Sequence, residues 1–212
     1  MIKKYKILSQ LQACGLVAVI RGSSAENAYQ TALACIKGQV TGIEIAFTTP
    51  HADHVIERLS KDVTDTRLII GAGTVLDEVS ARIAILAGAN FIVSPNFDPK
   101  VAQICNLYGI PYFPGCYTPQ DIQQALAAGV DVIKIFPASL GGPHLLAELK
   151  GPFPNLNLMP SGGVTLENLA AWFEAGAFIV GIGNQLVGPG QSKNYRQVTT
   201  NALNFYHQFH SI

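Results

Sequence analysis

The sequence predicts an α/β protein, folded as a single (β/α)8 TIM barrel over residues 1–212 with a short N-terminal helix. Short runs rich in β-branched residues begin about 20–26 residues apart along the whole chain. Segments rich in alanine and leucine, with the spacing of helices, lie between these runs. Alternation of strands and helices produces right-handed βαβ units, and therefore a parallel sheet.

The N-terminal segment, residues 1–14, reads as a short amphipathic helix that ends at Cys14. It is basic at its start but lacks the apolar core of a signal peptide. The eight predicted strands then follow in order, and helical patterns such as those at 26–36, 78–87, 119–128 and 166–175 lie between them. The strands are expected at residues 17–20, 43–47, 68–70, 91–93, 111–113, 132–136, 156–159 and 178–181.

The ends of the helices also carry recognisable signals. Side chains that can accept hydrogen bonds from backbone N–H groups precede several helices, and glycines that can adopt the left-handed conformation follow several others. An open, doubly wound sheet is the structural alternative, but no GxGxxG motif follows the first strand, which disfavours a dinucleotide-binding version. The expected N-caps are Ser24, Asp77, Asp98, Thr118 and Thr165, and the expected C-cap glycines are Gly38, Gly88, Gly109, Gly129 and Gly176.

The composition narrows the class of protein. Hydrophobic residues make up 49% of the chain and charged residues 13%, which excludes a disordered chain. The 14 basic residues balance the 14 acidic ones, so no basic excess is present to neutralise a nucleic-acid backbone. A surface with so little charge favours self-association. No apolar run is long enough to span a bilayer, and the four cysteines form no CxxC pair, so we expect reduced thiols in a cytoplasmic protein.

Lys134 is the residue most informative about chemistry. In a (β/α)8 barrel the active site lies at the carboxyl ends of the strands. Side chains alternate along a strand, so Lys134 points into the barrel if Ile133 and Ile135 face the helices. Burial disfavours the charged form of a lysine, and a neutral amine can attack a ketone to form a Schiff base. A lysine held by a buried salt bridge is the structural alternative.

Glu44 shows the same alternation, because Ile43 and Ile45 flank it in the second predicted strand. A carboxylate beside an amine can move protons while a carbinolamine forms and a carbon–carbon bond breaks. An ion pair with Lys134, or with Arg21 at the end of the first strand, would explain the same burial. The two interpretations are compatible, because a pair that is structural at rest can be catalytic in turnover.

Glycines follow three of the predicted strands. Gly162 and Gly163 after the seventh strand, and residues 181–184 after the eighth, match the position of the phosphate site of barrel enzymes. Backbone N–H groups can approach an anion closely where no side chain intervenes, although tight turns alone also explain such glycines. Residues 71–74 would let a ligand approach the third strand, with the Thr74 hydroxyl as a donor.

The histidines give no metal-binding pattern. Only His51 and His54 lie near a strand end, and no third ligand with evident spacing accompanies them. A catalytic zinc site usually needs three protein ligands. We therefore expect neither a metal ion nor a cofactor.

Collinear motifs that cover nearly the whole chain resemble one family. They are VIR at 19–21, IEI at 43–45, GAGTVL at 71–76, FIVSP at 91–95, PG at 114–115, IKIFPA at 133–138, GPF at 151–153 and PSGGV at 160–164. In combination they resemble the bacterial 2-keto-3-deoxy-6-phosphogluconate (KDPG) and 4-hydroxy-2-oxoglutarate (KHG) aldolases.

The resemblance implies a class I aldolase on a (β/α)8 barrel, usually a homotrimer, with no metal. Such an enzyme cleaves a 2-keto-4-hydroxy acid into pyruvate and an aldehyde, either glyceraldehyde 3-phosphate or glyoxylate. The resemblance assigns the Schiff-base lysine to Lys134 and proton transfer to Glu44. It suggests Thr74 and the Pro95 region for the pyruvyl carboxylate, and the glycines after strands seven and eight for a distal phosphate. The expected substrate-binding residues are Arg21, Thr48, Thr74, Pro95, Phe136, Ser161, Gly162, Gly163, Gly183 and Asn184.

The chain departs from the family pattern at three places. Thr48 stands where many relatives carry an arginine that helps to hold the anionic end of the substrate. Ser161 replaces a threonine and keeps the hydroxyl, and residues 181–184 read GIGN where relatives often have a Gly-Gly-Ser stretch. The first and third departures concern the preferred aldehyde half, and none of them touches Lys134 or Glu44.

Two other functions remain open from the sequence. One is a phosphate-binding barrel isomerase or synthase, in which Lys134 only neutralises a substrate anion and forms no covalent bond. The other is a non-catalytic protein that binds a sugar acid. Trapping of pyruvate on Lys134 separates the aldolase from both.

Overall fold

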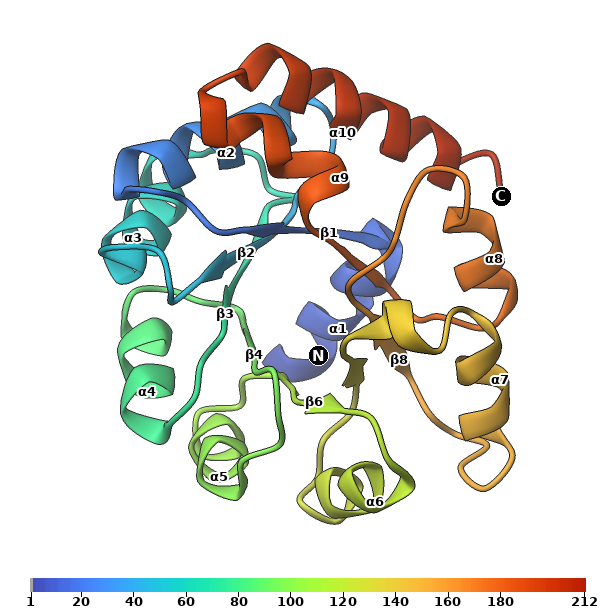
Figure 1. Cartoon of the computed structure of the whole chain (residues 1–212). Coiled ribbons are helices and arrows are strands. Elements are labelled where there is room, and N and C mark those ends of the chain that lie inside the picture. The colour runs from blue at the N-terminus through green and yellow to red at the C-terminus, as the bar shows by residue number, and fades with distance from the viewer. Residues whose placement is uncertain (1) are drawn as a thin grey trace.

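A computed structural model describes residues 2–212 as an α/β fold with a curled parallel sheet. Figure 1 shows the strands arranged around a centre, with most of the helices outside them. The strands are Leu16–Ile20 (β1), Gly42–Ala46 (β2), Ile69–Gly73 (β3), Phe91–Val93 (β4), Tyr112–Phe113 (β5), Gly115–Cys116 (β6), Ile133–Ile135 (β7), Leu158–Pro160 (β8) and Val180–Ile182 (β9).

Helices and short 3₁₀ turns connect the strands. They are Lys3–Cys14 (α1), Ala25–Lys37 (α2), Ala52–Asp62 (α3), Glu78–Leu86 (α4), Pro99–Leu107 (α5), Pro119–Ala127 (α6), Ala138–Leu140 (η1), His144–Lys150 (α7), Leu169–Glu174 (α8), Asn184–Val187 (α9), Gly188–Ser192 (η2) and Tyr195–Phe209 (α10).

All neighbouring strands pair in parallel, as the alternation of strands and helices predicts. Six strands form one sheet in the order β5-β4-β3-β2-β1-β9, and β6-β7-β8 form a second. Each of the eight predicted strands is present, and the fifth is broken into β5 and β6 around Pro114. Proline has no N–H to donate to a ladder, which explains the break.

The predicted helix ends are largely confirmed. The side chains of Ser24, Asp77, Asp98 and Thr118 each accept a hydrogen bond from a backbone N–H in the first turn of a helix. The prediction is wrong for the helix at 166–175, because residues 165–168 form a turn and α8 begins only at Leu169. Thr165 Oγ1 accepts from Asn168 N–H (3.4 Å) within that turn.

Helix α2 ends at Gly38 as predicted, but this glycine does not adopt the expected left-handed conformation. Gly88, Gly109, Gly129 and Gly176 have positive φ, as expected, but Gly38 has a φ of −85°. The left-handed position after α2 is instead taken by Gln39, with a φ of 69°. Gly38 is needed for close packing, because a Cβ there would overlap the side chain of Ala202 on α10.

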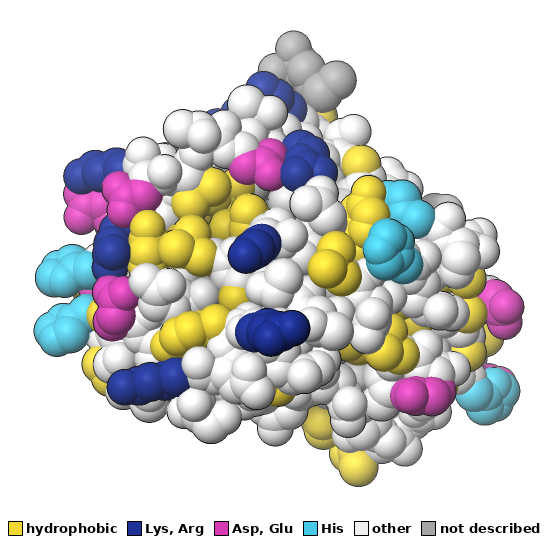
Figure 2. Space-filling view, turned by 90° about the horizontal axis from the view of Figure 1, so that it is seen from above, with side chains coloured by type: hydrophobic (Ala, Val, Ile, Leu, Met, Phe, Trp, Pro, Cys, Tyr) yellow, Lys and Arg dark blue, Asp and Glu magenta, His cyan; other side chains and the backbone are white. Residues whose placement is uncertain are grey.

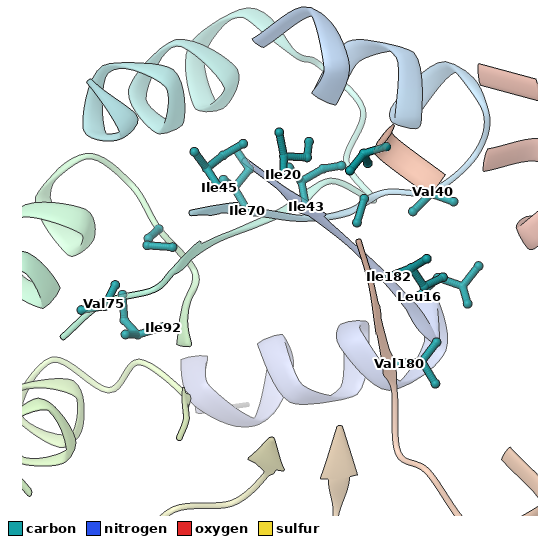
Figure 3. Packing of buried hydrophobic residues seen from close by; sticks show 14 of the residues in the cluster. Leu16, Ile20, Val40, Ile43, Ile45, Ile70, Val75, Ile92, Val180 and Ile182 are labelled. Atoms are coloured by element: carbon teal, nitrogen blue, oxygen red, sulfur yellow. The ribbon is translucent and has the colours of Figure 1, made fainter. Parts of the chain in front are cut away.

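The larger of two buried apolar clusters lies between the strands and the surrounding helices. Figure 3 shows Ile20, Ile43, Ile45 and Ile70 on the side of β1, β2 and β3 that faces the helices. Ile133 and Ile135 of β7 belong to the same cluster. Because side chains alternate along a strand, the residues between these isoleucines face the inside of the curled sheet.

The smaller cluster fills the inside of the sheet and is covered by the N-terminal helix. Ile7 and Leu11 of α1 pack with inward side chains such as Val17, Ile69 and Met159. Figure 1 shows α1 lying within the ring of strands. The predicted N-terminal helix is therefore confirmed over Lys3–Cys14, while Met1 lies outside the described residues.

The surface has few charges, as the composition indicates. On the face shown in Figure 2, charged side chains are separated by wide uncharged areas that include apolar side chains. Each helix within residues 2–212 is too short or too polar to cross a membrane. The four cysteines are free.

We expect Leu11→Ala to lower the free energy of unfolding by about 2–5 kcal/mol, because Leu11 is fully buried in the inner cluster and its loss leaves a cavity there. Urea unfolding of the purified protein measures the change. The matched control is Gln12→Ala, one residue along the same helix but exposed, which should change stability by less than about 0.5 kcal/mol. Equal effects of the two substitutions would contradict the assignment of α1 to the core.

Candidate active site

Lys134 and Glu44 meet inside the curled sheet. Lys134 lies on β7 and Glu44 on β2, and the neighbouring isoleucines on both strands face the helices. Lys134 Nζ is 4.0 Å from Glu44 Oε1, and the two side chains are 4% and 0% exposed. The pairing that the sequence left open as an ion pair is therefore present in the structure.

The carboxylate of Glu44 has no other polar contact. Both of its oxygens are buried, and neither accepts a hydrogen bond from any part of residues 2–212. Buried carboxylates are ordinarily hydrogen-bonded, because leaving one without a partner costs free energy. The Glu44 carboxylate, which contacts Lys134 but accepts no hydrogen bond, is thus available to exchange protons with a ligand bound at that lysine.

Glycine at position 73 makes room for this carboxylate. Gly73 is the last residue of β3 and lies beside Ala46 of β2. A Cβ at this position would overlap Glu44 Oε1. The third residue of the GAGT motif therefore serves the site by lacking a side chain, whereas the first, Gly71, makes room for the ring of Phe91.

Phe136 connects the buried pair to the surface. It directly follows β7, and its ring centroid lies 5.0 Å from Lys134 Nζ. Phe136 also lines a cavity of about 310 Å³ at the carboxyl ends of the strands. Lys134 and Glu44 are not among the residues that line this cavity, so the Phe136 ring is the side chain that links the cavity to the buried pair.

Seven of the expected substrate-binding residues line this cavity together. Gly162 and Gly163 have φ angles of 91° and 84°, which favour glycine at both positions and leave the backbone open to a ligand. Ser161 is 5% exposed at the end of β8. The seven residues are Arg21, Phe136, Ser161, Gly162, Gly163, Gly183 and Asn184.

The other three expected residues lie outside the lining of this cavity. Thr48 is exposed in the turn after β2. Thr74 directly follows β3 and adopts a left-handed conformation, with a φ of 54°. Pro95 is half-buried after β4, and its carbonyl group lies where a side chain at Gly115 would have to go.

Gln191, like Gln185, is a polar lining residue that the sequence did not point to. It belongs to η2 and reaches the cavity beside Arg21. Its side-chain amide donates a hydrogen bond to the Arg21 carbonyl, with Nε2 2.5 Å from the oxygen. No local pattern could have indicated it, because the contact joins residues 170 positions apart.

Other candidate chemistries find little support in this region. Burial raises the pKa of the Cys116 thiol, on β6 next to β7, to about 12, so this cysteine is protonated at neutral pH and is a poor nucleophile. His51 and His54 stack with their ring centroids 5.5 Å apart. No group of three or more His, Cys, Asp or Glu side chains within residues 2–212 has the arrangement of a metal site.

Comparison with known proteins places this chain among the aldolases. The family model described as "KDPG and KHG aldolase" matches residues 7–201, so the chain belongs to this aldolase family. Aldolases are carbon–carbon lyases.

Two characterised relatives show the extent of the match. The chain is 34% identical over 197 residues to the 2-dehydro-3-deoxy-phosphogluconate aldolase of Treponema pallidum, covering 91% of this chain and 92% of the relative. It is 35% identical over 178 residues to the 2-dehydro-3-deoxy-6-phosphogalactonate aldolase of Escherichia coli K12, covering 84% of this chain and 86% of the relative.

Solved structures agree with the family assignment. A native KDPGal structure superposes with a TM-score of 0.85 at 31% identity, covering 92% of this chain and 94% of the other. The KDPG aldolase of Legionella pneumophila superposes with a TM-score of 0.83 at 26% identity, covering 93% and 96%. That structure holds pyruvate captured at low pH as a covalent carbinolamine intermediate.

We expect Gly73→Ala to destabilise the protein by roughly 1–3 kcal/mol, because the added methyl overlaps the Glu44 carboxylate in a packed interior. In the Glu44→Ala background the same substitution should cost less by about 1 kcal/mol or more. Urea unfolding of the unmodified protein, the two single variants and the double variant measures this coupling.

Gly188→Ala is the control for the effect of adding a methyl group to a glycine. Gly188 has a φ of −50°, and a Cβ there would make only an ordinary contact with Asn184. If Gly73→Ala costs as much without the Glu44 side chain as with it, the glycine does not serve the carboxylate.

Proposed function

We propose that this protein catalyses the reversible cleavage of a 2-keto-4-hydroxy acid into pyruvate and an aldehyde through a Schiff base on Lys134. The observation that carries the proposal is the contact of a buried lysine with a buried carboxylate, next to a phenylalanine ring that also lines a cavity at the carboxyl ends of the strands. Membership of the aldolase family supports it. Substrates of this class are 2-dehydro-3-deoxy-6-phosphogluconate and 4-hydroxy-2-oxoglutarate, which release glyceraldehyde 3-phosphate and glyoxylate respectively.

The reaction begins at the C2 carbonyl of the keto acid. Lys134 first gives a proton to its partner Glu44, so that the neutral amine can add to C2, and the resulting carbinolamine loses water to become a protonated imine. Glu44 supplies the proton that the departing hydroxyl needs. The 4.0 Å between Nζ and Oε1 exceeds a hydrogen-bond distance, so the proton passes through a substrate oxygen or an intervening water molecule.

Cleavage uses the imine as an electron sink. Glu44, as a carboxylate, removes the proton of the C4 hydroxyl, again through a water molecule. The C3–C4 bond breaks, C4 leaves as the aldehyde, and the electron pair of the bond moves through C3 to the imine nitrogen to form an enamine. Protonation at C3 and hydrolysis of the imine release pyruvate and restore Lys134.

The expected substrate-binding residues have separate roles in this proposal. Phe136 packs against the bound keto acid beside Lys134, and Thr74 and Pro95 lie toward its pyruvyl carboxylate. Arg21 and the backbone of Gly162, Gly163 and Gly183 face the distal end, with Ser161 and Asn184 as further polar contacts. Thr48, exposed after β2 and outside the cavity lining, would meet only the far end of a long substrate.

For the fold, we propose that the curled sheet closes as a single eight-stranded (β/α)8 barrel over residues 1–212, with β5 and β6 as one broken strand. Lys134 N–H donates to the Pro114 carbonyl (2.9 Å), which continues the pairing across the break. Phe178 N–H donates to the Leu158 carbonyl (2.8 Å), and Ser161 bridges to Gly181, which links β8 to β9. A cytoplasmic location stays a prediction.

We expect borohydride reduction in the presence of pyruvate to leave a stable adduct on Lys134, because reduction converts the imine to a secondary amine. Peptide mass mapping locates the adduct. Lys134→Arg should abolish it, whereas Lys100→Arg, an exposed lysine paired with Glu78 on the outer surface, should not.

A missing adduct, or an adduct confined to another lysine, would reject the Schiff-base mechanism. Turnover without an adduct would favour an isomerase or synthase in which Lys134 acts only as a charge. Ligand binding without turnover would favour a non-catalytic sugar-acid binding protein.

We also propose that the protein is a homotrimer, and that the neighbouring helices α4 and α5 take part in the contact. Val79, Ile83 and Leu86 on α4 and Leu107 on α5 are exposed by 64%, 42%, 68% and 73%. Large apolar side chains gathered on one surface typically mark a protein interface. A designed protein cage that superposes on this chain with a TM-score of 0.85 is built from symmetric oligomeric domains.

Light scattering should give a mass three times the 22.6 kDa of one chain. The double variant Val79→Asp/Leu86→Asp should have a lower mass, because charges buried in the contact oppose association. The corresponding double variant Lys61→Asp/Gln12→Asp, at exposed polar sites, is the control. A monomer mass for the unmodified protein would contradict the trimer.

A further inference from the structure

The loop that follows β1 is held in place by three side chains, two from distant parts of the chain and one from the helix that follows the loop. In residues 21–23, here called the Arg21 loop, each residue has one backbone polar group bound by a side chain. Gln191 donates to the Arg21 carbonyl (2.5 Å), and Gly22 N–H donates to Thr49 Oγ1 (3.0 Å). Ser23 N–H donates to Asn27 Oδ1 (3.3 Å). Each residue of this irregular segment thereby has a backbone hydrogen bond to a side chain.

Gln191 itself is on a well-anchored turn. Asn27, 4% exposed on α2, donates through Nδ2 to the carbonyl of Gly190 (2.7 Å). Gly190 also approaches α2 closely, since a Cβ there would lie 2.6 Å from Thr31 Oγ1. The Gln191 backbone therefore cannot shift without disturbing α2, and its amide reaches the Arg21 loop from a rigid base.

Arg21 is the charged residue at the mouth of the cavity. Of the lining residues that the structure describes, only Arg21 has a charged side chain. Its guanidinium takes part in none of the ion pairs formed within residues 2–212. Arg58 and Arg67, by contrast, are paired with carboxylates. The Arg21 side chain is thus exposed, uncommitted and attached to a backbone that is held in place.

We propose that Gln191 is a positioning residue for substrate recognition, which acts by holding the Arg21 carbonyl so that the guanidinium faces the anionic distal end of the substrate. This inference rests on the proposed aldolase function and deepens it. A guanidinium that is already oriented loses less conformational entropy when it binds an anion, so its contact contributes more to affinity. Gln191 thereby contributes to affinity for a phosphorylated substrate without taking part in bond cleavage.

The first test separates affinity from chemistry. Gln191→Leu removes the amide donor and keeps a similar volume. With 2-dehydro-3-deoxy-6-phosphogluconate as substrate, KM should rise about 3- to 10-fold, as expected for one lost hydrogen bond, while kcat stays within about 2-fold. The borohydride-trapped pyruvate adduct should form as in the unmodified protein, because pyruvate has no distal anionic group. Gln197→Leu is the control. Gln197 is an exposed residue of α10, and its side-chain amide donates a hydrogen bond to Asn201.

The second test asks whether Gln191 acts through Arg21. In an Arg21→Gln background, Gln191→Leu should raise KM by less than about 1.5-fold, because the guanidinium that it positions is gone. An equal rise in both backgrounds would overturn the proposal and would mean that Gln191 contacts the substrate directly or acts on the fold. An unchanged KM in the single variant would also overturn it.

A binding measurement that needs no turnover distinguishes this proposal from the proposed function. Inorganic phosphate should raise the Tm of the unmodified protein, and should raise it less in Gln191→Leu and in Arg21→Gln. If no pyruvate adduct forms but this pattern holds, the aldolase function fails and the positioning role stands. If the adduct forms but phosphate stabilises Gln191→Leu as much as the unmodified protein, the positioning role fails alone.

Discussion

The contact between Lys134 and Glu44 is the constraint around which the inside of this protein is organised. Two opposite charges lie 4.0 Å apart in a place where the side chains are nearly inaccessible to solvent. Either charge alone would be strongly destabilising there, whereas each partly compensates the other. Substrate chemistry needs both groups unshielded by other partners, and the carboxylate oxygens of Glu44 indeed accept no hydrogen bond from residues 2–212.

The space around this pair is divided by side-chain size. Toward the amino ends of the strands, α1 closes the interior with Ile7 and Leu11, and the aromatic rings of Phe91 and Phe113 stack with their centroids 5.5 Å apart. Toward the carboxyl ends, a glycine is found where another group comes close, as at Gly73, which lies against the Glu44 carboxylate. The apolar half stabilises the fold, and the open half admits a ligand. The same strands run through both halves. The packing of the apolar half therefore also holds the strands that carry Lys134 and Glu44.

The cavity and the buried pair are held in place in different ways. Lys134 and Glu44 extend from regular strands whose ladders fix their direction. In the Arg21 loop, which contributes to the cavity, the backbone is irregular, and side chains supply the hydrogen bonds that a ladder would otherwise provide. Thr49, Asn27 and Gln191 do so. The buried pair and the cavity are thus supported by separate sets of contacts.

The sequence alone determined the positions of the strands, most helix caps and the inward direction of Lys134 and Glu44, because alternation and capping are local properties of a few neighbouring residues. It placed Gly38 wrongly in the left-handed conformation and began α8 three residues early, since packing against α10 and a turn at residues 165–168 overrode the local preference. Tertiary structure decided what depends on distant segments. This includes the separation of the lysine and the carboxylate, the grouping of seven cavity residues without Thr48, Thr74 and Pro95, and the contact of Gln191 with Arg21. These features arise only when the curled sheet brings strand ends together, and no pattern within one segment records them.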